Sequence, residues 1–142
     1  VLWKRIVYEE LARFLDVPGG QKIVEESYAQ LRKFNCWTAS VVQQYGKFKH
    51  SRIRPVVIGN SKQFWLLRQF DRSDVDDLAH DIGLPETVCG SIQNYPMPEQ
   101  QPVGKKFSSL CLFSPVSDPP LCGTVRHVQL PDDSHEKAEK SA

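Results

Sequence analysis

Apolar residues recur at helical spacing through the first third of the chain, and this pattern predicts three helices. Within residues 2–15 the apolar side chains fall close to one stripe, and the "VPGG" at 17–20 ends that helix. The segment 21–34 repeats apolar residues at i, i+4 and i+7, as an amphipathic helix requires. A third helix is predicted over 35–46, because Asn can cap its start and Gly can stop its end.

The periodicity changes after this helical region. Residues 51–70 are rich in β-branched and aromatic side chains and predict a β-hairpin, although the second arm, 62–70, also fits a short helix. The stretch "DDLAHDIGLPETVCGSI" then has the rhythm of a helix-turn-helix, with helices over 73–82 and 85–93. Two further strands are predicted over 105–114 and 123–130.

The order of these elements favours an α+β fold that is mainly helical. Residues 9–20 resemble residues 76–87, and each copy precedes strand-like runs, so two small winged-helix-like units in tandem with short β-hairpins fit the layout. The units would cover 1–70 and 71–131, followed by a polar tail over 132–142. The alternative is that both segments simply use residues that favour a helix and then end it.

Charge is strongly segregated, although the formal net charge is only +1. Between Ser27 and Phe70 the sequence has eight Lys or Arg and no Asp or Glu, whereas 71–99 has seven acids and one Arg. A merely solvated face normally carries both signs. The acid-free segment therefore indicates contact with a polyanion, and the acidic segment indicates a basic protein partner or a contact with the basic segment inside the same molecule.

The helix-turn-helix rhythm does not predict a DNA reader. Residues 73–104 contain no Lys or Arg, and a cluster of carboxylates would be repelled by phosphates. We expect this helix pair, 73–92, to face a basic protein partner through its acids, which are Asp74, Asp76, Asp77, Asp81 and Glu86.

The basic segment is the predicted nucleic-acid site. Its cations would contact phosphates of RNA or DNA over 32–68, and Tyr45 and Phe48 would stack on unpaired bases. The alternative is that Phe48 and Ile53 are core residues and that the basic run pairs with the acidic run at 71–86 within the same molecule. The predicted contact residues are Arg32, Lys33, Tyr45, Lys47, Phe48, Lys49, His50, Arg52, Arg54, Lys62 and Arg68.

Enzyme and metal chemistry find little support. Cys36 lies at a predicted helix start, where a dipole activates a thiol, but a small buried residue there is commoner. The two nearest cysteines are ten residues apart, unlike the paired ligands of structural zinc sites. We therefore expect no enzyme activity, no metal and no cofactor.

The functional hypothesis is a non-enzymatic nucleic-acid-binding module of an intracellular multi-subunit assembly, with a nuclear location favoured. The four cysteines could form two disulfides, but we interpret them as free thiols. That interpretation, the lack of a signal peptide and the lack of an apolar run long enough for a membrane favour this setting. The alternative is a protein–protein adaptor without a nucleic-acid role, anchored by the aromatic-rich 64–70.

Overall fold

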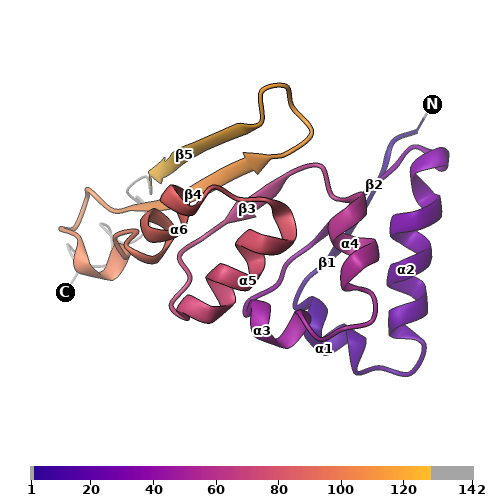
Figure 1. Cartoon of the computed structure of the whole chain (residues 1–142). Helices are drawn as coiled ribbons and strands as arrows, with labels where there is room; N and C mark the ends of the chain where they lie inside the picture. Colours follow the sequence, from indigo (N-terminus) through magenta and orange to yellow (C-terminus); the bar gives the residue numbers. More distant parts are fainter. Residues whose placement is uncertain (1, 129–142) are drawn as a thin grey trace, which may run out of the picture.

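The computed structural model describes residues 2–128, which form two sheets and the helices around them (Figure 1). The strands are β1 (Lys4–Tyr8), β2 (Cys36–Ser40), β3 (Phe64–Leu66), β4 (Phe107–Ser114) and β5 (Leu121–Val128). The helices are α1 (Leu11–Leu15), α2 (Gly20–Gln30), α3 (Tyr45–Phe48), α4 (Arg54–Asn60), α5 (Arg72–Ile82) and α6 (Glu86–Gln93). Two 3₁₀ turns, η1 (Leu31–Phe34) and η2 (Pro98–Gln100), complete the order.

The first sheet is a parallel pair of strands, β1 and β2, joined through α1, α2 and η1. The predicted helices over 2–15 and 35–46 are wrong for most of their length. Ile6, Val7 and Tyr8 are β-branched or aromatic residues, which favour a pleated, half-buried surface. Tyr8 and Ser40 turn towards α2, where Tyr8 Oη lies 2.8 Å from Ser27 Oγ.

The second sheet is antiparallel in the order β3-β4-β5, with α5 and α6 against one face (Figure 1). Strands β4 and β5 confirm the C-terminal pair predicted from the sequence. The predicted hairpin over 51–70 is wrong, since residues 54–60 form helix α4. Pro55 lies in its first turn, where a missing N–H is tolerated and the fixed φ suits a helix. Only Phe64–Leu66 is a strand, paired with β4.

The helix pair over 73–93 is confirmed as α5 and α6. Asp71 caps α5, because its carboxylate accepts a hydrogen bond from the Asp74 backbone N–H at 3.2 Å. Val75, Leu78 and Ile82 are buried at helical spacing.

The predicted fold class is wrong in its two specific parts. The described chain is an α+β mix, 42% helical and 23% strand, rather than a mainly helical protein. Two winged-helix-like units in tandem are excluded because the two sheets differ, one parallel and one antiparallel. The echoed segments also differ in structure, since 9–20 contains a turn and the short α1 whereas 76–87 runs from the middle of α5 into α6.

One apolar core joins both sheets and positions the basic and acidic segments next to each other. Leu11 and Val24 from the first half share a buried cluster with Phe48, Ile82 and Phe113. None of the helices between residues 2 and 128 has both the length and the apolar character that crossing a bilayer demands.

Candidate nucleic-acid interface

The aromatic residues of the predicted site lie in the core. Tyr45 is 6% exposed and Phe48 is 2% exposed, and the two rings pack edge to face on α3. A ring must be exposed to stack on an unpaired base. The burial of Tyr45 and Phe48 leaves no free ring face for the predicted stacking, and it agrees with the alternative interpretation of Phe48 and Ile53 as core residues.

Two of the predicted phosphate-binding cations are instead engaged by α5. Lys49 Nζ lies 3.3 Å from Asp74 Oδ1 and 2.7 Å from Asp77 Oδ2. Arg54 Nη1 lies 3.1 Å from Asp81 Oδ2. We call these five residues, together with Tyr45 and Gly46, the charge seam between α3–α4 and α5.

The seam also contains two uncharged donors. The Tyr45 hydroxyl donates a hydrogen bond to Asp81, and the Gly46 backbone N–H donates to Asp74 Oδ2 at 2.9 Å. Burial raises the pKa of Tyr45, and the hydrogen bond to Asp81 raises it further. The hydrogen bond from Lys49 lowers the pKa of Asp77, and the pKa of Lys49 rises correspondingly. In the seam, cations of the basic segment thus pair with acids of the acidic segment within the same molecule.

The acids predicted to face a protein partner are divided by this arrangement. Asp74, Asp77 and Asp81 have intramolecular basic partners in the seam. Asp76 pairs with Arg72 on the surface of α5 at 2.9 Å, and Glu86 is exposed in the first turn of α6. Glu86 and Asp76 are therefore the exposed acids outside the seam that the prediction of a basic protein partner over 73–92 retains.

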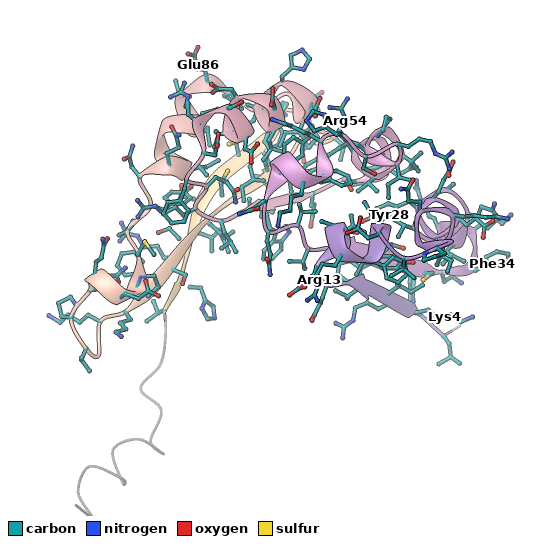
Figure 2. All side chains as sticks on the ribbon, turned by 90° about the horizontal axis from the view of Figure 1, so that it is seen from below. Lys4, Arg13, Tyr28, Phe34, Arg54 and Glu86 are labelled. Carbon is teal, nitrogen blue, oxygen red and sulfur yellow. The ribbon has the colours of Figure 1, made fainter. Side chains whose placement is uncertain are left out.

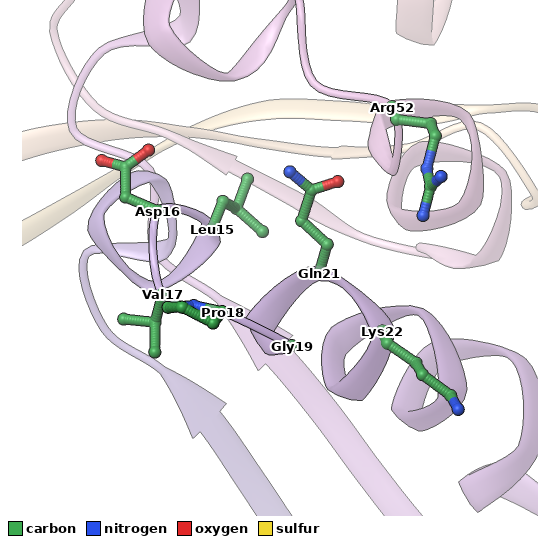
Figure 3. A pocket seen from close by; sticks show the side chains of 8 residues that line it. All are labelled: Leu15, Asp16, Val17, Pro18, Gly19, Gln21, Lys22 and Arg52. Carbon is green, nitrogen blue, oxygen red and sulfur yellow. The ribbon is translucent and has the colours of Figure 1, made fainter.

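The predicted cations that follow η1 and lie outside the seam have different surroundings. Arg52 and Lys22 lie on the rim of an open hollow of about 450 Å³ at the start of α2 (Figure 3). Asp16 lies on the same rim, so side chains of both positive and negative charge line the hollow. Arg68 donates to the Tyr95 carbonyl at 2.9 Å. Exposed elsewhere are Lys47, His50 and Lys62.

One group of exposed cations includes two residues that sequence reasoning missed. Arg32 and Lys33 lie in η1, which follows α2, and the chain then enters β2 at Cys36. Lys4 lies at the same end of the first sheet, because its backbone N–H donates to the Asn35 carbonyl at 3.0 Å, and Arg5 follows it in β1. Figure 2 places Lys4 and Phe34 at the same end of the molecule.

These four cations, Lys4, Arg5, Arg32 and Lys33, form what we call the β1–η1 cluster. Among residues 2–128 none of the four has a salt-bridge partner, whereas Arg13 and Lys22 are paired with glutamates. The β-branched residues that follow Lys4 and Arg5 favour a strand here. The apolar residues over 2–15 also fit helical spacing, and the helix was predicted for that reason.

The environment of Cys36 does not resemble an activated nucleophile. This residue lies in β2 and its thiol approaches the Trp37 carbonyl, so it does not sit at the helix N-terminus that the sequence predicted for it. Within residues 2–128 the side chains of His, Cys, Asp and Glu form no group of three or more suited to a metal ion.

Comparison with known proteins adds no relative to this picture: the chain matches no family model, no curated protein and no solved structure.

Proposed function

We propose that the chain is a non-enzymatic module that binds nucleic acid in an intracellular nucleoprotein assembly, with the β1–η1 cluster as its main phosphate contact. The observation that supports this proposal is the parallel pairing of β1 with β2, which brings the strand of Lys4 and Arg5 next to the end of the segment that carries Arg32 and Lys33. Four exposed Lys and Arg that have no acidic partner within residues 2–128 create a positive potential that a phosphate backbone neutralises, with release of its counterions.

The proposal shifts the centre of the site away from residues 45–54. Lys49 and Arg54 form ion pairs with α5 in the seam. Charge reversal at these two residues would place like charges next to the acids of α5 and destabilise the fold. Lys47, His50, Arg52 and Lys62 are exposed outside the β1–η1 cluster and provide secondary contacts.

Charge reversal in the β1–η1 cluster tests this function. Fluorescence anisotropy with labelled oligonucleotides over about 50 to 200 mM salt measures the affinity and its salt slope. Arg32→Glu with Lys33→Glu is expected to weaken binding strongly and to reduce the slope by about 1.4 to 1.8, the share of two phosphate contacts.

A matched variant controls for net charge. Lys105→Glu with Lys106→Glu makes the same change in charge in the segment before β4 and is expected to weaken binding much less. Equal losses in the two variants would show that only overall charge matters. Wild-type protein that binds no oligonucleotide at the lowest salt would refute the function.

A protein–protein adaptor is the second candidate, supported by the sheet of β3, β4 and β5. Trp65 is 65% exposed, and Leu67 and Phe70 are also exposed, whereas Phe64 and Leu66 pack inward. Large apolar side chains grouped on a surface are typical of protein contacts. Loss of a co-purifying partner on Trp65→Ala, without an effect on oligonucleotide binding, would support this second role.

A further inference from the structure

Three exposed aromatic rings accompany the β1–η1 cluster. Trp3 is 79% exposed, and Phe34 and Trp37 are each 57% exposed. Tyr45 and Phe48, the rings first expected to contact bases, are buried. The aromatic and cationic residues of the site therefore come from two segments, 3–5 and 32–37, that are far apart in the sequence.

The register of the parallel strands determines which of these side chains share a face. Arg5 pairs with Trp37, and paired residues in a sheet point to the same side. Trp3 lies two residues before Arg5 and so belongs to the same side. Tyr8 and Ser40 lie on the opposite side, where Tyr28 Oη on α2 donates to Ser40 Oγ at 2.8 Å. Helix α2 therefore covers the other face and leaves Trp3, Arg5 and Trp37 open.

Phe34 ends η1, just before β2, and its exposed ring lies at the end of the sheet where Lys4 also lies (Figure 2). Lys33 Nζ lies 5.2 Å from the centre of its ring, close enough for a cation–π contact. Parallel sheets are normally covered on both faces, so two strands with one open face that carries Trp and Arg form an unusual surface.

We propose that this surface binds single-stranded nucleic acid, with Trp37, Trp3 and Phe34 stacked on about three unpaired bases. The inference rests on the proposed function and specifies its ligand. Exposed rings beside unpaired cations suit such a strand, because bases supply the π faces and phosphates supply the negative charge. Bases in a duplex are stacked on each other and offer no free face to these rings.

Charge complementarity favours a nucleic acid over an apolar protein partner at this surface. A partner that covered Trp37 with apolar groups would also desolvate Arg5 beside it, without providing a counter-charge. A phosphate backbone provides that charge at each nucleotide. Of the two acids in the turn after β1, Glu10 is bound by Arg13 at 2.9 Å, and Glu9 is exposed at the end of the strand remote from Lys4.

The experiment compares Trp37→Ala with Trp65→Ala in the full chain. Both side chains are exposed tryptophans in strands, and Trp65 lies on the other sheet, which makes it a matched control. Probes are labelled oligo(U) and oligo(dT) of about 12 nucleotides, the oligo(dT)–oligo(dA) duplex, and polyglutamate. Circular dichroism confirms that each variant is folded.

Trp37→Ala is expected to weaken single-strand binding by about 5- to 100-fold, and Phe34→Ala to have an effect in the same range. Trp65→Ala is expected to keep the affinity within about twofold, and the duplex to bind more weakly than the single strand. A second readout uses Trp65→Phe, which leaves Trp3 and Trp37 as the tryptophans of the chain. Stacking should quench their fluorescence as oligo(U) is added.

The contrary outcomes are distinct. If Trp37→Ala and Phe34→Ala bind single strands like wild type, while Arg32→Glu with Lys33→Glu does not, stacking is refuted and phosphate binding stands. Duplex bound as tightly as single strand also refutes stacking. Polyglutamate binding that is lost in Trp37→Ala would assign the surface to an acidic protein. Failure of all nucleic-acid probes to bind would remove both the inference and the proposed function.

Discussion

Removing the carboxylate of Asp81 should destabilise the fold more than removing any exposed acid of α5. The Asp81 side chain is 17% exposed and accepts hydrogen bonds from the Tyr45 hydroxyl and from Arg54 Nη1. A hydrogen bond to a charged group contributes about 1.5 to 3 kcal/mol, and Asp81→Ala leaves the Tyr45 hydroxyl near the core without its acceptor. Arg54 is 36% exposed at its side chain, so water compensates it and its pair adds only about 0.5 kcal/mol.

The total expected loss for Asp81→Ala is about 2 to 3.5 kcal/mol in the free energy of unfolding. With a urea m value of about 2 kcal/mol per M, the unfolding midpoint falls by about 1 to 2 M. Asp76→Ala is the control, because its partner Arg72 is exposed, and its midpoint should fall by only about 0.2 M.

A double-mutant cycle isolates the hydrogen bond itself. Tyr45→Phe combined with Asp81→Ala should lose less than the sum of the single changes, with a coupling energy of about 1.5 kcal/mol. Equal midpoints for Asp81→Ala and Asp76→Ala would refute the reasoning, since the seam would then contribute no more than a surface ion pair.

Three further outcomes follow from the same contacts. The pKa of Asp77 is lower in the fold than its ordinary value of about 3.9, so its ion pair stabilises the protein above that value and is lost as the pH falls through the folded pKa. Urea unfolding at several pH values should show this loss in wild type and a smaller one in Asp77→Asn. Gly46→Ala should lower the melting temperature, because the new Cβ would lie 2.8 Å from a seam carboxylate, whereas Gly59→Ala in an open part of α4 should not. Cys122 is exposed and should react with a thiol reagent at pH 8, while burial raises the pKa of Cys111 to about 12 and should keep it unreactive until the protein unfolds.

The parts of the fold that sequence reasoning found are those with strong local signals. Helices α5 and α6 combine helical spacing with a glycine stop at Gly83, whose φ is +73°, and β4 and β5 are consecutive strands. Strand β1 was missed because its partner β2 lies beyond α1, α2 and η1, and no local pattern records a parallel partner at that distance.

The candidate site shows the same division between local and long-range information. The absence of acids from Ser27 to Phe70 is visible in the sequence, and so is the acidic block that follows. Which cations face those acids depends on how α3 packs on α5, which brings Lys49 to Asp77 and leaves Arg32 free. Burial of Phe48 also depends on that packing, because an aromatic residue in a basic run fits a core and a base platform equally well.

The parallel pairing of β1 with β2 makes the β1–η1 cluster dependent on local opening of the chain end. The strand of Lys4 and Arg5 stays next to the segment of Arg32 only while the ladder from Lys4–Cys36 to Tyr8–Ser40 is closed, and a strand held by one neighbour opens before the core does. A bound oligonucleotide that contacts both segments must then slow amide hydrogen exchange in β1 while leaving exchange in β4 unchanged. Binding thus stabilises the paired state of β1, and fraying of β1 weakens binding.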